Sequence, residues 1–190
     1  RLGGMDWGGS PGNPNVAVVL GVDANQHVHQ CAELTCDPLS QDSALEQMIR
    51  FFGHWDSRRL IQRFTGDHGV GIDELHRHLD VNRSRRVYAA EKWGKRKQGI
   101  DLIEVLLKQN RLTLNPDCYR SVDEFSGYRF RETMDPNSRE RYQTKTPVDH
   151  HADLMDARRY ALFPFERVLL RGSSQGIANI SGRPLSTRAV

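Results

Sequence analysis

Apolar residues in the first part of the chain occur in short runs that turn-forming residues separate. Residues 2–7, 16–23 and 27–34 each have the length and composition of a β-strand. Glycine and proline separate the first two runs, and the polar residues 23–26 separate the second from the third. The pattern predicts an antiparallel meander of three strands.

The spacing of apolar residues changes to a helical one after residue 43. Ser43 is followed by Glu46 three positions later, which is the pattern of a capping box. A strand over residues 60–65 comes next, and a strand after a helix indicates a crossover onto the same sheet. The apolar positions that we expect to face the sheet from this helix are Leu45, Met48, Ile49, Phe52 and Trp55.

The remaining patterns alternate between helices and strands. A helix over residues 100–109 should face inward with Ile100, Ile103 and Leu107. The whole pattern predicts an α/β fold with a mixed sheet, in which the meander is joined by parallel strands and flanked by helices. The other elements that we expect are a short helix with Ile72, Leu75 and Leu79, strands at 86–89 and 112–114, a helix or turn at 116–125, hairpin arms at 128–132 and 141–145, and a helix within 149–162.

The composition is that of a folded domain. The chain has 190 residues, of which 37% are hydrophobic and 27% charged, and its net charge of +3 permits a nucleic-acid partner without requiring one. No apolar run reaches the roughly 20 residues of a membrane span and no secretory signal is present, so we expect a cytosolic protein with reduced cysteines. We assign residues 1–171 to one domain, excised from a longer protein. The Gly-, Ser- and Arg-rich residues 172–190 should be a flexible tail.

Several acidic residues occupy positions where a charge is unusual or close to another charge. Asp6 ends the first strand, where an apolar residue is usual, and Asp67 follows the strand at 60–65. Asp153 and Asp156 are three positions apart, so on a helix they are neighbours and repel each other. A divalent cation would offset this repulsion. A turn-capping acid or a solvated helix face would explain each residue singly.

Two further groups could bind a ligand. Lys92, Lys95, Arg96 and Lys97 cluster ahead of a predicted helix, with Trp93 among them, and are candidates for contacts with DNA phosphates. An ordinary solvated loop is the alternative. A zinc site from His27, His29, Cys31 and Cys36 is conceivable, although structural zinc sites usually take their ligands from two separated knuckles.

These segments together resemble the C-terminal nuclease domain of the large terminase subunit of tailed bacteriophages, which has a ribonuclease H-like fold. The resemblance covers most of the chain and follows the family's order. The segments that carry it are GMDWGG at 4–9, FTGDHGVG at 64–71, GKRKQGI at 94–100, EFSGYRFRE at 124–132 and DHHADLMDARRYAL at 149–162.

The last segment is the most specific of these. Asp156 and Ala157 precede Arg-Tyr-Ala at residues 159–161 with the family's spacing. Many relatives have a histidine three positions before the final aspartate, whereas this chain has Asp153 there. Both Asp153 and Asp156 therefore stay candidates for the third metal ligand, with Asp156 preferred.

The resemblance implies a metal-dependent endonuclease. Asp6, Asp67 and Asp156 would be catalytic, and with Asp153 they would hold two Mg²⁺ or Mn²⁺ ions about 3.5 to 4 Å apart. The substrate would be double-stranded viral DNA, cut with little sequence preference during genome packaging. Implied partners are an ATPase domain earlier in the same polypeptide, the small terminase subunit and the portal of the procapsid. The place of action would be the host cytoplasm, transiently at the procapsid.

Two other functions fit the same residues. Another ribonuclease H-like nuclease, such as a junction resolvase, would share the carboxylates but not the segment at 156–161. A non-catalytic module that binds DNA or the capsid would use its acidic residues for structure alone. A titration with divalent metal separates the module from the nucleases, and substrate preference separates the two nucleases.

Overall fold

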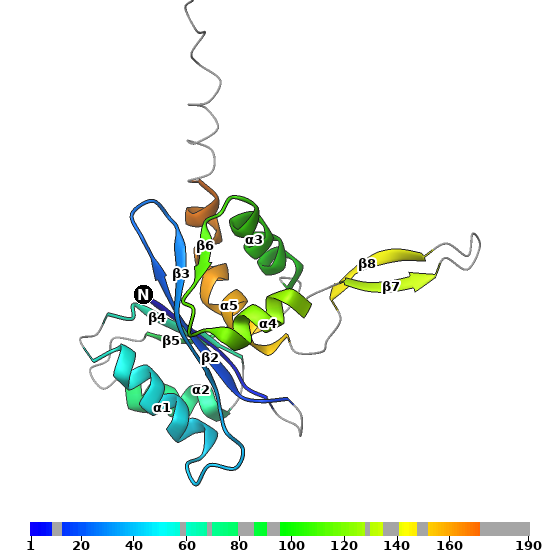
Figure 1. Cartoon of the computed structure of the whole chain (residues 1–190). Coiled ribbons are helices and arrows are strands. Elements are labelled where there is room, and N and C mark those ends of the chain that lie inside the picture. Colours follow the sequence, from blue (N-terminus) through cyan, green and yellow to red (C-terminus); the bar gives the residue numbers. More distant parts are fainter. Residues whose placement is uncertain are drawn as a thin grey trace, which may run out of the picture.

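The structure is a computed structural model, shown in Figure 1. Its core is one mixed sheet with helices on both faces, and a separate hairpin projects from it. The structure describes residues 1–8, 13–57, 60–67, 70–79, 86–90, 96–127, 130–134, 141–147 and 152–171.

The elements follow the predicted order. The strands are β1 (Leu2–Asp6), β2 (Val16–Val22), β3 (Val28–Thr35), β4 (Arg63–Gly66), β5 (Val87–Ala89), β6 (Leu112–Leu114), β7 (Phe130–Met134) and β8 (Arg141–Pro147). The helices are α1 (Ala44–Trp55), α2 (Val70–Leu79), α3 (Arg96–Lys108), α4 (Tyr119–Gly127), α5 (Asp153–Leu162) and the 3-10 helix η1 (Phe163–Phe165).

The sheet has six strands in the order β5-β4-β1-β2-β3-β6. β1, β2 and β3 form the predicted antiparallel meander. β4 lies parallel to β1, β5 lies parallel to β4, and β6 lies parallel to β3. The predicted combination of an antiparallel meander with parallel strands is therefore confirmed.

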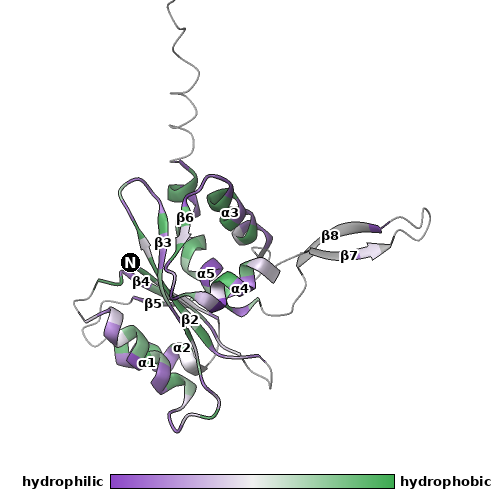
Figure 2. Cartoon of the chain, in the orientation of Figure 1, coloured by the Kyte–Doolittle hydropathy of each residue, from purple (hydrophilic) through white to green (hydrophobic). Residues whose placement is uncertain are grey.

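Two hydrophobic clusters hold the helices against the two faces of the sheet. Alternate residues of β1 point in opposite directions, so Leu2 joins one cluster and Met5 the other. α1 and α2 cover the Met5 face, whereas α3 and α5 cover the Leu2 face (Figure 1). The central strands are largely hydrophobic, and hydrophilic residues lie on the outer sides of α1 and α3 (Figure 2).

The sequence predicted the start of α1 correctly and the buried face of α3 incorrectly. Ser43 caps α1 in the predicted capping box, in which its hydroxyl accepts from the Glu46 backbone and the Glu46 side chain accepts from the Ser43 backbone. In α3 the prediction that Leu107 faces inward is wrong, because this side chain is 41% exposed. Leu102 and Leu106 are buried instead, since the helix turns the face that also contains Ile103 toward the sheet.

α5 lies very close to the central strand. A Cβ atom built on Gly4 would be only 2.0 Å from the carbonyl oxygen of Ala157. Glycine is therefore required at this point of β1, because any side chain would push α5 away from the sheet. The contact fixes the distance between α5 and the end of β1, where Asp6 lies.

The hairpin formed by β7 and β8 is a second, two-stranded sheet that projects from the body (Figure 1). The hairpin predicted for this part of the chain is confirmed. In the described part of the chain, no helix has the length and apolar character needed to cross a membrane. The predicted tail at 172–190 lies outside the described residues.

Candidate metal and nucleic-acid site

Asp6 and Asp67 come from neighbouring strands. Asp6 is the last residue of β1, and Asp67 follows the last residue of β4 directly. These strands are parallel and adjacent, with Met5 of β1 opposite Gly66 of β4. The next residue of each strand is a candidate aspartate, so the fold brings Asp6 and Asp67 to the same edge of the sheet.

Strand alternation also places both aspartates on the face that α5 covers. Gly4 contacts α5, so Asp6, two residues later, points the same way. In β4 the side chain of Phe64 belongs to the cluster on the opposite face, which leaves Thr65 and, by continued alternation, Asp67 on the α5 face. One carboxylate oxygen of Asp67, Oδ1, is buried.

Asp153 and Asp156 lie in the first turn of α5 but in different surroundings. Asp156 Oδ1 accepts a hydrogen bond from Arg159 Nε at 3.1 Å. The charge of Asp153 instead acts on Glu124, a residue of α4. The two candidates for the third ligand are therefore distinguished by their neighbours.

Tyr160 is a residue of α5 whose hydroxyl is influenced by two of the candidate aspartates. The pKa of the Tyr160 hydroxyl is raised to about 12, mainly by burial and next by the charge of Asp6. Arg159 acts in the opposite direction, and Asp156 again raises the pKa. The charges of Asp6 and Asp156 thus converge on one hydroxyl group, which favours Asp156 over Asp153 as the partner of Asp6.

The described residues contain no group of three or more His, Cys, Asp or Glu side chains that could hold a metal ion. Asp6 and Asp67 each follow the last residue pair of β1 and β4, while Asp156 accepts a hydrogen bond from Arg159. His27, His29, Cys31 and Cys36 are all among the described residues and do not form such a group. The zinc site considered for them is therefore not formed. The histidines at 68, 150 and 151 lie outside the described residues.

The predicted basic cluster is only partly visible. Lys92 and Lys95 lie outside the described residues, and the side chain of Arg96 does too, although its backbone begins α3. Lys97 is exposed in the first turn of α3, and its Nζ lies 3.7 Å from a carboxylate oxygen of Asp101. The contacts of this cluster with DNA stay a prediction.

A buried polar network that the sequence did not reveal supports the start of α5. Arg158 is fully buried and donates through Nε to Gln30 Oε1 at 2.5 Å, and its Nη1 lies 3.4 Å from Glu124 Oε2. Glu124 Oε1 in turn accepts from the backbone N–H of Leu154 at 3.0 Å. The N-cap residue of α5, Ala152, has no side chain that could do this, so Glu124 caps α5 from a neighbouring helix.

Burial dominates the electrostatics of this network. It raises the pKa of Glu124 to about 7, although Arg158 acts in the opposite direction. It also lowers the pKa of Arg158 to about 10, although Glu124 raises it. Desolvation therefore outweighs the attraction between the two charges, as is usual for buried ion pairs.

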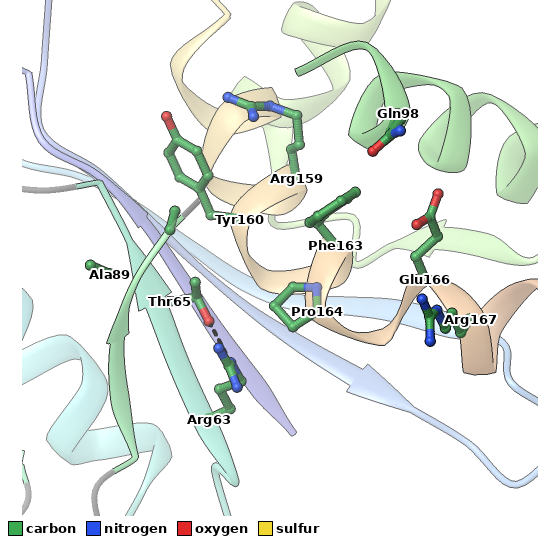
Figure 3. A pocket seen from close by; sticks show the side chains of 11 residues that line it. Arg63, Thr65, Ala89, Gln98, Arg159, Tyr160, Phe163, Pro164, Glu166 and Arg167 are labelled. Atoms are coloured by element: carbon green, nitrogen blue, oxygen red, sulfur yellow. Dashed lines mark hydrogen bonds between the residues drawn. The ribbon is translucent and has the colours of Figure 1, made fainter. Parts of the chain in front are cut away.

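A cavity of about 480 Å³ lies between β4, β5, α5 and η1 (Figure 3). Its lining includes Arg63, Arg159 and Arg167, which come from three different parts of the chain. No sequence motif marked these arginines as a group, because their proximity depends on how the strands and helices pack.

No protein-family model and no curated protein matches the sequence. The fold matches solved structures instead. The large terminase from the thermophilic bacteriophage D6E is 14% identical with a TM-score of 0.57, over 90% of this chain and 39% of that one. The large terminase nuclease from the thermophilic phage G20c with bound magnesium is 17% identical with a TM-score of 0.55, over 84% of this chain and 78% of that one.

The same G20c nuclease with bound zinc is 15% identical with a TM-score of 0.54, over 85% of this chain and 78% of the other. This chain thus spans about two fifths of the D6E large terminase and most of the G20c nuclease. Identities this low concern the fold. The chain has the ribonuclease H-like fold of large terminase nuclease domains.

Proposed function

We propose that the chain is a metal-dependent endonuclease that cuts double-stranded DNA with little sequence preference during viral genome packaging. The observation that carries the proposal is the placement of Asp6 and Asp67 at adjacent ends of parallel strands, under α5 with Asp156. The nuclease from phage G20c that shares this fold is described with bound magnesium, zinc and cobalt.

The residues present suit a hard divalent cation. Asp6, Asp67 and Asp156 offer carboxylate oxygens, which Mg²⁺ and Mn²⁺ prefer, and Asp153 is the alternative to Asp156. The charges of Asp6 and Asp156 already converge on Tyr160 in a buried setting, where their repulsion is costly without a cation. Arg159 now pairs with Asp156 and partly offsets this charge.

When bound, two such ions would supply an activated water and stabilise the charge that develops at the cut phosphate. The chain's own residues would position the reactants. The strand ends fix Asp6 and Asp67, and the close packing of Gly4 on α5 fixes Asp156 relative to them. No side chain is required as a nucleophile, and basic residues would hold the DNA backbone without reading bases.

The packaging partners form part of the proposal. An ATPase domain in the same polypeptide, the small terminase subunit and the portal would direct this nuclease to the genome. The match to only 39% of the D6E large terminase supports the first of these, because it leaves most of that longer chain without a counterpart here.

Plasmid cleavage tests the nuclease activity. We expect the protein to cut supercoiled plasmid with Mg²⁺ or Mn²⁺ and not with a chelator. Asp6→Asn, Asp67→Asn and Asp156→Asn should each abolish cutting while circular dichroism stays unchanged. Asp73→Asn is the matched control, because Asp73 is an exposed aspartate of α2, on the other face of the sheet.

Three other results would contradict the proposal. Cutting that is unaffected by chelator, or that survives in Asp6→Asn and Asp67→Asn, would remove the carboxylates from the chemistry. A strong preference for branched DNA would indicate another ribonuclease H-like nuclease, such as a junction resolvase. DNA binding without cutting under any metal condition would indicate a non-catalytic module.

A further inference from the structure

The cavity lies on the same face of the sheet as α5, over the part of β4 and β5 that α5 does not cover. β4 and β5 form its floor through Arg63, Thr65 and Ala89, while α5 and η1 form a wall (Figure 3). Gln98, in the first turn of α3, lies at another side. Strands and helices of the main domain therefore bound the cavity, which a ligand could enter from solvent.

The lining of this cavity is rich in positive charge. Arg63 comes from β4, Arg159 from α5 and Arg167 from the helical residues 166–171. Among the described residues of the lining, Glu166 is the one acidic residue, and Thr65 adds a neutral polar group. The described lining therefore offers three guanidinium groups for one carboxylate, with Arg159 also paired to Asp156, and this balance favours an anionic ligand.

Neighbouring groups hold two of these arginines in place. Arg63 donates through Nε to Thr65 Oγ1 at 3.1 Å, and its guanidinium carbon lies 3.9 Å from the centre of the Tyr88 ring. Arg159 has a side chain only 5% exposed, held by Asp156 and packed along Gly99 of α3. Side chains held in this way lose little further freedom when they bind a ligand.

Residues of the cavity lining adjoin the candidate metal site. Tyr160 lines the cavity, and its hydroxyl experiences the charges of Asp6 and Asp156. On the floor, Thr65 precedes Asp67 by two residues of the same strand edge, and Ala90 donates its backbone N–H to Gly66 at 2.6 Å. A ligand in the cavity would therefore lie on the same face of the sheet as the aspartates, two residues along the chain from Asp67.

We propose that this cavity binds a phosphate group of the DNA backbone next to the phosphate that is cut. The inference rests on the proposed nuclease function and adds a subsite to it. A volume of about 480 Å³ is that of a small-molecule site and cannot admit a duplex, so the DNA lies outside and inserts a backbone group. Guanidinium groups bind phosphate oxygens through paired hydrogen bonds.

The salt dependence of DNA binding tests this subsite. Binding of a short duplex is measured at several salt concentrations in chelator, so that no DNA is cut and the nuclease proposal is not involved. Arg63→Gln and Arg167→Gln should each weaken binding of all sequences alike. Each variant should lower the slope of log affinity against log salt by about 0.9, the value for one lost phosphate contact.

Arg171→Gln is the matched control. Arg171 lies one helical turn beyond Arg167, is exposed and does not line the cavity, but the substitution removes the same charge. We expect its slope to equal that of the wild type. Arg159 is left unchanged in this comparison because it also contacts Asp156.

The source of the phosphate is tested with nuclear magnetic resonance. The side-chain Nε–H signals of Arg63 and Arg167 should shift on addition of the duplex, and much less with inorganic phosphate at the same phosphate concentration. Slopes for Arg63→Gln and Arg167→Gln that match Arg171→Gln would overturn the subsite. Shifts caused by inorganic phosphate and not by DNA would also overturn it, since the cavity would then bind a free anion.

Failure of the subsite and failure of the nuclease proposal give different results. Plasmid cutting with unchanged salt slopes would leave the enzyme without this subsite. Lowered slopes in a protein that never cuts DNA would keep a phosphate-binding cavity on a non-catalytic module. Circular dichroism and melting temperature establish that Arg63→Gln is folded, and Arg63→Lys provides a variant that keeps the charge and the slope.

Discussion

Two consecutive arginines of α5 have opposite surroundings. Arg158 is fully buried between α4 and the sheet, where it contacts Glu124, Gln30 and the ring of Phe125. Arg159 is part of the cavity lining, pairs with Asp156 and lies over the ring of Tyr160. The first arginine does not line the cavity, and the second is part of the proposed DNA site.

Arg158 therefore contributes to the stability of α5, whereas Arg159 belongs to the proposed ligand site on the same helix. Arg158 and Glu124 hold the start of α5 in place, because Glu124 also caps the helix through Leu154. Arg159 places a positive charge beside the carboxylates that we propose as metal ligands. Substitutions of the two arginines should therefore differ in kind, the first acting on folding and the second on ligand binding.

The largest expected effect is that of Arg158→Met on stability. The variant leaves the buried carboxylate of Glu124 without its charged partner, which costs about 3–5 kcal/mol when one member of a buried pair is removed. The measurement is urea unfolding at pH 8, above the Glu124 pKa of about 7 in the wild type. Arg158 lowers that pKa, so its loss should also let Glu124 keep its proton to a higher pH. Arg171→Met, at an exposed position, should change the free energy of unfolding by less than about 0.5 kcal/mol.

The double variant Arg158→Met with Glu124→Gln sharpens this result. It removes both charges but keeps an oxygen that can accept from the Leu154 N–H. We expect it to regain most of the stability lost in Arg158→Met, because no uncompensated charge stays buried. A double variant as unstable as the single one would show that Arg158 acts through packing alone.

The second prediction concerns pH. The pKa of Glu124 is raised from 4.5 to about 7, so the folded state keeps the proton that the unfolded chain releases first. The stabilisation is complete below pH 4.5 and is lost as the pH rises to about 7. Its size is up to about 3 kcal/mol, at about 1.36 kcal/mol per pKa unit.

Glu124→Gln should remove this pH dependence. Between pH 4.5 and 7 the free energy of unfolding of the wild type should fall relative to that of the variant. Above that range the difference between the two proteins should be constant. Unfolding in urea at a series of pH values gives both curves. Parallel curves for the two proteins would mean that Glu124 has an ordinary pKa in the folded state.

The smallest effect on stability is expected for Arg159→Gln. Loss of one charge-assisted hydrogen bond to Asp156 should cost about 1–2 kcal/mol. The melting temperature should then rise more on addition of Mg²⁺ than in the wild type, because the cation no longer competes with Arg159 for Asp156. An Mg²⁺ response equal to that of the wild type would separate Asp156 from the metal site.

The sequence was sufficient to predict the order of elements and the place of two aspartates. Short apolar runs with turn residues between them identify the meander, and a strand after α1 identifies the crossover that brings β4 beside β1. The adjacency of Asp6 and Asp67 follows from that topology. Their function as metal ligands is a proposal that the structure supports through their placement.

Contacts between residues that are far apart in the chain could not be predicted from the sequence. Arg158 and Glu124 are 34 positions apart, and Arg158 and Gln30 are 128 apart, so no local pattern indicates that they meet. An arginine in a helix is usually solvent-exposed, so the residue type alone gives no reason to expect that Arg158 is buried. Leu107 was wrongly predicted to face inward. α3 has apolar residues on more than one side, so their spacing alone does not identify the buried face.

Metal binding by the aspartate variants tests the central claim most directly. Calorimetric titration of the metal-free protein with Mn²⁺ should show binding in the wild type and in Asp73→Asn, and none in Asp6→Asn or Asp67→Asn. In metal-free buffer, Asp6→Asn should melt at the same or a higher temperature than the wild type, since a repelling charge is gone. Unchanged Mn²⁺ binding in both Asp6→Asn and Asp67→Asn would contradict the claim that these strand ends form a metal site.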